Sequence, residues 1–266
     1  MSKIITLITD FGIKDCYVGV MKGVISSIIS SASIIDLTHE VKAGDIEEAA
    51  FIIQAAFKYF PKGTIHVIVV DPGVGSNRRV IIVESKDYYF IAPDNGVLNY
   101  IVEPLKDIKI ISALNKKYFL KDISHTFQGR DIFAPLAAYL ALGIDIKEFG
   151  EEIKEITTFP IKKVTKEDSL LMGEVIYIDK FGNLVTNFTP PNLSFSKDII
   201  IKIKDYKIFK INDFYAQSKE GELLAIWGSS DHLEISINGE SAEEFLRAKK
   251  GDLVTVSLNS EKTSKF

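Results

Sequence analysis

Two charged residues that follow an apolar segment have the types and spacing needed for acid–base chemistry. Asp71 comes directly after the apolar residues 65–70, and Arg78 lies seven positions further along the chain. A carboxylate held beside a fixed positive charge can act as a base toward a bound water or hydroxyl group. The same two side chains could also form a structural ion pair, and the sequence leaves both interpretations open.

A second polar group stands in the segment HTFQGRDIFAP at residues 125–135, just before the apolar run 132–142. It contains His125, Gln128 and Asp131. Asp131 occupies a position where a helix N-cap is expected. His125 could be an ordinary loop histidine, so the residues by themselves do not decide whether the histidine or the glutamine takes part in chemistry.

Two further groups suit a nucleoside or an amine. Asp10 follows the apolar residues 4–8, where a carboxylate either caps the next turn or holds ribose hydroxyls. Asp179, Phe181 and Asn183 lie at i, i+2 and i+4, so they would share one face of an extended strand. An acid, a ring and an amide could hold an amine and contact a base. The plainer interpretation is a strand end followed by a turn.

Other motifs exclude some kinds of site. The Gly-rich segment DPGVGSNRR at residues 71–79 fits neither phosphate-loop spacing, and no helix pattern follows it. The four histidines are scattered without an H-x-x-x-H pair, and Cys16 is the single cysteine. We therefore expect no metal site and no intramolecular disulfide.

Strand and helix patterns alternate through the first 150 residues and would position these groups. Short β-branched or aromatic runs predict strands at residues 4–8, 34–37, 65–70, 80–83 and 89–91. Several lack polar alternation, which is typical of strands buried on both faces. Helical spacing predicts helices at residues 18–29, 45–57 and 132–142, the second with a capping box of Asp45 and Glu48. This alternation predicts an α/β domain with a mainly parallel sheet between helices.

The pattern changes near residue 157, in the polar segment TTFPIKKVTKEDS. Short strand-like runs punctuated by Gly, Asn, Asp and Ser follow at residues 174–178, 184–187, 199–203, 207–211, 222–226, 233–237 and 253–258. Such a series is typical of a small barrel or sandwich. We therefore predict an α/β N-terminal domain at residues 1–158 and an all-β C-terminal barrel domain at residues 168–266.

Composition limits the classes of partner. The chain has 266 residues, 46% of them hydrophobic, and a formal net charge of −4, which gives no basic footprint for nucleic acid. The first residues lack the apolar region of a secretory signal, and no apolar run approaches the roughly 18 residues of a membrane span. We expect a cytoplasmic protein that binds neither nucleic acid nor membranes.

Taken together, the motifs TDFG, THE, FPKGTIHVIVVDPGVG, APDNG, F-x-GRDIFAP and DKFGNLVTN resemble those of the S-adenosyl-L-methionine hydroxide adenosyltransferase family. This family, also known as DUF62, is related to the fluorinase and chlorinase enzymes. The resemblance covers nearly the whole chain and implies an α/β domain followed by a β-barrel. It also implies a homotrimer with active sites between subunits, and no cofactor. The implied reaction is hydrolysis of S-adenosyl-L-methionine to adenosine and L-methionine, by attack of water on ribose C5′.

The resemblance also implies roles for particular residues. Asp71 and Arg78 match the catalytic aspartate and arginine, and Gln128 stands where the family motif has a histidine. Glutamine can hydrogen-bond a water but cannot take its proton, so Gln128 is expected to orient water while Asp71 and Arg78 activate it. The implied substrate-binding residues are Asp10 for the ribose, Tyr17 and Asn95 at the pocket, Asp179 for the methionine amine, Phe181 and Asn183 for adenine, and Ser241.

Two other functions stay open. Halide transferases share the implied fold, but in the fluorinase the position of Asp71 is not a carboxylate and that of Gly129 is a serine. A negative charge at Asp71 would repel a halide by on the order of a few kcal/mol in a dry pocket. The other alternative is a protein that senses S-adenosyl-L-methionine or adenosine with little turnover, and Gln128 is the feature that supports it.

Overall fold

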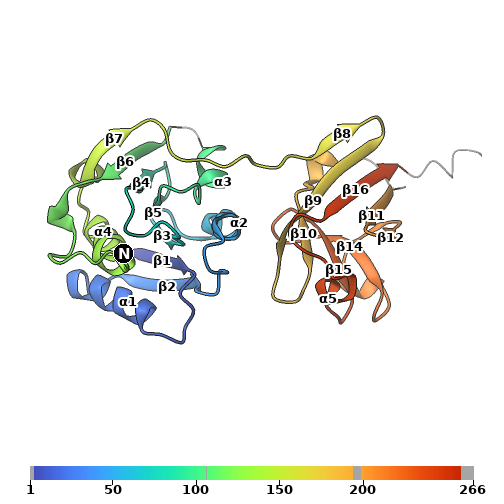
Figure 1. The fold of residues 1–266 in the computed structure, drawn as a ribbon, viewed down its shortest axis with the longest axis horizontal. Helices are drawn as coiled ribbons and strands as arrows, with labels where there is room; N and C mark the ends of the chain where they lie inside the picture. Colours follow the sequence, from blue (N-terminus) through green and yellow to red (C-terminus); the bar gives the residue numbers. More distant parts are fainter. Residues whose placement is uncertain (1–2, 106, 194–198, 259–266) are drawn as a thin grey trace, which may run out of the picture. The chain divides into compact units, whose positions relative to one another are not determined.

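The computed structural model describes residues 3–105, 107–193 and 199–258. The chain divides into two compact units, Met1–Ile161 and Lys162–Phe266, and each has its own sheet and hydrophobic core (Figure 1). Among the described residues, no helix combines the length and apolar character that crossing a membrane requires.

A seven-stranded sheet in the order β2-β1-β3-β5-β4-β6-β7 forms the centre of the first unit. Its strands are β1 (Ile4–Thr9), β2 (Ser33–Thr38), β3 (Ile65–Val69), β4 (Val80–Glu84), β5 (Tyr89–Pro93), β6 (Lys109–Ala113) and β7 (Gly150–Ile153). Strands β2, β1, β3 and β5 pair in parallel, as the strand–helix alternation predicts. Strands β4, β6 and β7 add antiparallel pairs, so the complete sheet is mixed.

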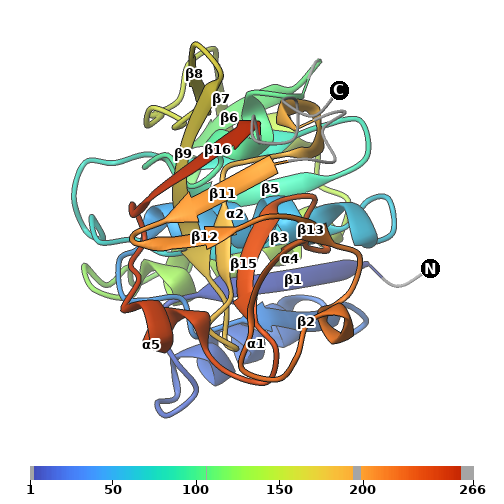
Figure 2. The same cartoon turned by 90° about the vertical axis from the view of Figure 1, so that its right-hand side faces the viewer.

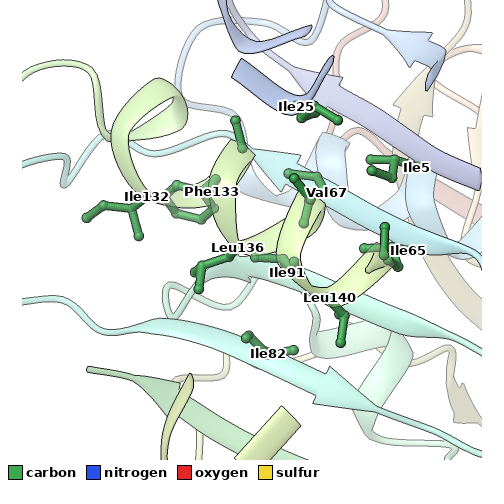
Figure 3. Packing of buried hydrophobic residues seen from close by; sticks show 14 of the residues in the cluster. Ile5, Ile25, Ile65, Val67, Ile82, Ile91, Ile132, Phe133, Leu136 and Leu140 are labelled. Carbon is green, nitrogen blue, oxygen red and sulfur yellow. The ribbon is translucent and has the colours of Figure 1, made fainter. Parts of the chain in front are cut away.

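Helices cover both faces of this sheet. On one face α1 (Tyr17–Ile28) and α4 (Ala134–Ala141) pack over a core that Figure 3 shows from close by. On the other face lie α2 (Ile46–Ala56) and α3 (Asn99–Val102). Val67 belongs to the first core and its neighbour Ile68 to the second, so both faces of β3 are buried. Burial on both faces therefore explains why this strand lacks alternation of polar and apolar residues.

The helix predicted at residues 132–142 begins earlier and in another form. A π-helical turn, η3 (Gly129–Phe133), leads directly into α4. Asp131 lies inside this turn with its side chain fully buried. Its oxygens accept hydrogen bonds from the backbone N–H of Ser124 at 2.7 Å and from Nε of Arg130 at 2.6 Å. The N-cap role expected for Asp131 is therefore wrong, because the carboxylate ties down the loop before the turn instead.

The second unit is a nearly closed, barrel-like sheet of nine strands, as predicted. The strand order is β12-β11-β16-β9-β10-β15-β14-β13, with β8 beside β9, and β12 also contacts β14. Strands β12, β11, β16 and β9 can be followed side by side in Figure 2. The strands are β8 (Thr165–Glu167), β9 (Leu170–Ile178), β10 (Leu184–Thr186), β11 (Ile199–Ile203), β12 (Tyr206–Ile208), β13 (Ile211–Asn212), β14 (Leu223–Trp227), β15 (Leu233–Ile237) and β16 (Leu253–Leu258). One short helix, α5 (Ala242–Leu246), follows β15.

Short 3₁₀ turns complete the two units. They are η1 (Phe57–Tyr59), η2 (Lys116–Tyr118), η4 (Ile146–Phe149), η5 (Pro190–Asn192) and η6 (Tyr215–Gln217). The start of α2 agrees with its predicted cap, because the side chain of Asp45 accepts a hydrogen bond from the backbone N–H of Glu48 at 3.0 Å.

His66 is a buried ionisable residue packed among the aromatic rings of the second core. Its Nδ1 lies 2.7 Å from the hydroxyl of Thr6, and its ring stacks on Phe90 with centroids 5.3 Å apart. Burial lowers the pKa of His66 from 6.5 to about 4. Between these values the unfolded chain binds more protons than the folded chain, so acid favours unfolding.

We expect the free energy of unfolding of the first unit to fall by about 3 kcal/mol as the pH drops from 6.5 to 4. Over this range His66 takes up a proton in the unfolded chain, whereas it stays neutral in the folded core. Denaturant unfolding across this pH range measures the slope. The variant His66→Phe keeps a ring in the core and should remove this part of it. An NMR titration that gave His66 a pKa near 6.5 would contradict the prediction.

Candidate active site

Loops that follow three parallel strands meet at the carboxyl edge of the first sheet. Strands β1, β3 and β5 are neighbours, and Asp10, Asp71 and Asn95 follow them. The side-chain amide of Asn95 donates to the carbonyl oxygen of Val70 at 2.9 Å, and its oxygen accepts from the backbone N–H of Val97 at 3.2 Å. Asn95 therefore fixes the backbone immediately before Asp71.

Arg78 joins Asp71 and Gln128 into one hydrogen-bonded group. Nε and Nη2 of Arg78 donate to Oδ2 of Asp71 at 2.8 and 2.5 Å, and Nη2 also donates to Oε1 of Gln128 at 2.5 Å. The side chains of Asp71 and Arg78 are only 5% and 11% exposed. Burial strengthens the electrostatic interaction between them, since little water screens it.

The two oxygens of Asp71 have different surroundings. Oδ2 accepts both hydrogen bonds from Arg78, whereas Oδ1 is buried and accepts none from the described residues. A buried polar atom without a partner is costly, so it is unusual in an ion pair that serves structure alone. A bound water could donate an O–H to this atom. The unpaired Oδ1 therefore favours the functional interpretation of the pair.

Gln128 belongs to this group, and the structure places His125 outside it. Because a guanidinium only donates, the oxygen of Gln128 faces Arg78, and its NH₂ group points away as a donor. His125 is exposed and meets the loop of Asp71 through its backbone. Gly75 has φ +80°, and a Cβ there would collide with the carbonyl oxygen of His125. Glycine at this position lets the loop at residues 71–79 pack against the segment of Gln128.

Three aromatic rings lie beside Gln128. Tyr17, the first residue of α1, packs on Phe127 and Phe11 with ring centroids 5.0 and 5.8 Å away. A Cβ added to Gly129 would lie 3.4 Å from the Phe11 ring, so a small residue suits this position. Tyr17 is 44% exposed, so part of its ring remains accessible to a ligand.

Asp10 is tied to a neighbouring loop. Its Oδ2 accepts a hydrogen bond from the backbone N–H of Gly44 at 2.8 Å, which links the segment after β1 to the segment before α2. The carboxylate thus bridges two loops instead of capping the turn that follows it. Because Asp10 is only half-buried, this bond fixes a carboxylate that a ligand can still reach.

The second unit contains a cavity of about 760 Å³. Four residues that the sequence singles out line it: Asp179, Phe181, Asn183 and Ser241. The hydroxyl of Ser241 accepts from the backbone N–H of Glu244 at 3.1 Å and so caps α5. The structure therefore brings these four together, although Ser241 lies 58 to 62 positions beyond the others in the chain.

A turn, not an extended strand, gathers the first three of these residues. Oδ1 of Asp179 accepts from the backbone N–H groups of Phe181 and Asn183 at 2.8 and 2.9 Å, and Oδ2 accepts from the side-chain amide of Asn183 at 2.8 Å. Gly182 has φ +79° within this turn. The one-face arrangement considered for a strand is therefore wrong, since Asp179 organises the turn around its own carboxylate.

Tyr215, Trp227 and Glu234 are among the further lining residues of the cavity that the sequence patterns miss. The hydroxyl of Tyr215 donates to Oε2 of Glu234 at 3.3 Å. Burial raises the pKa of Glu234, and the negative charge of Asp179 raises it further. Burial likewise raises the pKa of Tyr215. The sequence signal that could have identified Glu234 is a glutamate within the apolar strand 233–237, because acidic residues are rarely buried without a partner or a role.

Comparison with known proteins identifies the relatives of this chain. The family model for the SAM hydroxide adenosyltransferase N-terminal domain matches residues 5–150, and that for the C-terminal domain matches residues 173–255. The chain belongs to the SAM hydroxide adenosyltransferase family. It is 35% identical over 267 residues to an (R)-S-adenosyl-L-methionine hydrolase of Methanocaldococcus jannaschii, with 95% of each chain covered.

Two further proteins help to place this SAM hydroxide adenosyltransferase family member. The crystal structure of an uncharacterized conserved protein from Thermotoga maritima matches it with a TM-score of 0.89 and 36% identity, over 95% of this chain and 99% of that chain. A fluorinase from Actinoplanes sp. is 29% identical over 69% of this chain and 71% of its own. The similarity to the fluorinase is thus lower and covers less of the chain.

The two units of this SAM hydroxide adenosyltransferase family member offer different chemistry. The first has a buried carboxylate, a guanidinium and an amide that can orient and deprotonate a small nucleophile. The second has a cavity lined by carboxylates and aromatic rings, and its lining residues include no lysine, arginine or histidine. No group of three or more His, Cys, Asp or Glu in the described ranges is placed to hold a metal ion.

Proposed function

We propose that this protein hydrolyses (R)-S-adenosyl-L-methionine to adenosine and L-methionine. The observation that carries the proposal is the buried group of Asp71, Arg78 and Gln128, in which Oδ1 of Asp71 is left without a partner. Identity of 35% over nearly the whole chain with a protein named (R)-S-adenosyl-L-methionine hydrolase supports the same reaction.

The reaction is an in-line displacement at the ribose C5′ carbon. The oxygen of water forms a bond to C5′ while the C5′–S bond breaks, and its electron pair stays on sulfur. Methionine leaves as a neutral thioether from a sulfonium, so the leaving group needs no proton and the reaction needs no cofactor. The remaining requirement is to orient the water, remove its proton and exclude competing solvent.

The catalytic group meets that requirement with three side chains. Oδ1 of Asp71 accepts the proton of the attacking water. Arg78 holds the carboxylate through Oδ2 and stabilises negative charge on the oxygen. The NH₂ group of Gln128, turned away from Arg78, donates a hydrogen bond that orients the water.

The substrate-binding residues divide between ribose, methionine and adenine. In the first unit, Asp10 binds the ribose hydroxyls, Tyr17 lies near the methionine end, and Asn95 shapes the pocket edge by holding the backbone before the catalytic carboxylate. In the second unit the binding residues are Asp179 for the methionine ammonium, Phe181 and Asn183 for adenine, and Ser241, which closes the cavity.

Water is favoured over halide as the nucleophile. The carboxylate of Asp71 is nearly buried and would repel a halide at the same position. Gly129 has no hydroxyl that could hold one, and a Cβ added at this position would lie 3.4 Å from the Phe11 ring.

The variant Asp71→Asn tests the catalytic assignment. In ¹⁸O water, the wild-type protein should convert S-adenosyl-L-methionine to adenosine labelled at the 5′ oxygen. The variant should lose about 10²- to 10⁴-fold in kcat with little change in KM, because an amide cannot accept the proton. Mass spectrometry of the adenosine gives the label, and chromatography gives the rate.

Asp94→Asn is the matched control for Asp71→Asn. Asp94 is also a buried carboxylate paired with an arginine, Arg79, but its second oxygen accepts from the backbone N–H of Thr157 at 2.7 Å. The Asp94→Asn variant should lower the stability of the protein and leave kcat nearly unchanged. Tight binding of S-adenosyl-L-methionine without release of adenosine by the wild type would contradict hydrolysis and identify a binding protein.

Gln128→His should change the pH profile of kcat/KM. Glutamine has no ionisation, whereas histidine titrates near pH 6 to 7. The variant should therefore show an additional limb at about that pH, measured by initial rates across the pH range. His125→Gln serves as the control at an exposed neighbouring position and should leave the profile unchanged. An unaltered profile in Gln128→His would mean that residue 128 does not contact the reacting water.

We also propose that the protein is a cytoplasmic homotrimer, in which the second unit of a neighbouring chain completes each active site. The catalytic group lies in the first unit and the cavity for the methionine ammonium lies in the second. Two large apolar side chains are exposed in the single chain: Ile13, three residues after Asp10, is 78% exposed, and Phe181, which lines the cavity, is 75% exposed. A neighbouring subunit would cover such surface.

Complementation between inactive variants tests the shared site. Asp71→Asn and Asp179→Asn should each be inactive, yet trimers assembled from an equal mixture should regain about one quarter of wild-type activity. Half of the first units and half of the second units are intact, so about a quarter of the sites combine two intact halves. Light scattering checks the trimer. Activity no higher than that of the separate variants would mean that each site is built from one chain.

A further inference from the structure

The cavity of the second unit contains a buried carboxylate to which the proposed function assigns no role. Glu234 lies in β15, lines the cavity and is 8% exposed. The backbone of Gly228 lies so close to Oε1 of Glu234 that a Cβ at position 228 would overlap it. The glycine therefore leaves the room in which this carboxylate sits.

Asp179 by itself cannot satisfy an ammonium group. A carboxylate has about four lone-pair positions. The turn around Asp179 already uses three of them, two on Oδ1 and one on Oδ2. An ammonium has three N–H donors. Asp179 can therefore accept about one of them, and the others need an acceptor elsewhere in the cavity.

Glu234 retains most of its capacity to accept hydrogen bonds. In the part of the chain that the structure describes, the hydroxyl of Tyr215 is the one donor that reaches it, at 3.3 Å on Oε2. This bond orients the carboxylate through Oε2, and Oε1 accepts no hydrogen bond from the described residues. A second carboxylate that is buried, oriented and largely unsatisfied therefore lies near the first.

The charge of the cavity also favours a cationic ligand. Its lining includes Asp179, Glu234 and Glu240, and none of its lining residues is basic. The negative charge of Asp179 adds to burial in raising the pKa of Glu234, which indicates that the two carboxylates repel each other. A cation held between them would remove this repulsion.

We propose that Glu234 is a second acceptor, beside Asp179, for the α-ammonium group in the methionine portion of the substrate. The inference rests on the proposed function, because it takes S-adenosyl-L-methionine as the ligand. Asp179 accepts one N–H and Oε1 of Glu234 accepts another, while Tyr215 holds the carboxylate in place. Glu234 thereby becomes a specificity-determining residue that selects ligands with the ammonium group.

Binding of three probes to the wild type and to Glu234→Gln tests the inference. The probes are L-methionine, 4-(methylthio)butanoate, which is methionine without its amino group, and adenosine. Calorimetry or competition should show that Glu234→Gln weakens the binding of L-methionine about 10-fold or more, since the amide oxygen of glutamine carries no negative charge to pair with the ammonium. Binding of 4-(methylthio)butanoate and of adenosine should stay within about twofold.

Two further variants separate this role from a general one. Glu240→Gln removes a charge from the same cavity at an exposed position, and it should weaken the binding of L-methionine by less than about twofold. Tyr215→Phe keeps the carboxylate of Glu234 and removes the hydrogen bond that orients it. Its affinity for L-methionine should therefore lie between those of the wild type and Glu234→Gln.

Two outcomes would overturn the inference. L-methionine bound equally well by the wild type and Glu234→Gln would mean that Glu234 does not contact the ammonium. Equal weakening of all three probes would mean that Glu234 supports the shape of the cavity instead. Neither outcome bears on hydrolysis, because failure of the proposed function would appear separately, as wild-type protein that releases no adenosine from S-adenosyl-L-methionine.

Discussion

The guanidinium of Arg78 is the constraint on which the candidate active site depends. It donates two hydrogen bonds to one oxygen of Asp71 and a third to Gln128, and so joins segments 50 residues apart. Because a guanidinium is planar and cannot lose its proton, it sets both partners at once. It leaves Oδ1 of Asp71 and the NH₂ group of Gln128 as a matched acceptor and donor.

The rest of the first unit keeps that group in place. Parallel pairing of β1, β3 and β5 brings three chain segments to one edge, where Asn95 fixes the backbone before Asp71. Buried Asp131 anchors the segment that carries Gln128, and Gly75 lets the two loops touch. Positions far from the reacting atoms therefore decide where those atoms lie.

The second unit contains an acidic cavity, which we propose holds the cationic part of the substrate. The turn of Asp179 gives a carboxylate that is oriented but nearly saturated with hydrogen bonds. Glu234, oriented by Tyr215, supplies unused acceptors in the same cavity. S-adenosyl-L-methionine carries an ammonium and a sulfonium, whereas both products lack the sulfonium. Under the proposed binding mode, an acidic cavity suits the substrate better than the products.

The sequence by itself determined the strand–helix alternation, the barrel that follows it and the family, because these depend on local periodicity and on motifs that are contiguous in the chain. It also named Asp71, Arg78 and Gln128, yet could not say which of Gln128 and His125 joins the other two. Only the tertiary structure decided that choice, the buried role of Asp131, the turn of Asp179 and the place of Glu234. Each depends on contacts between distant segments or on the direction of a side chain, and these are fixed by packing rather than by spacing along the chain.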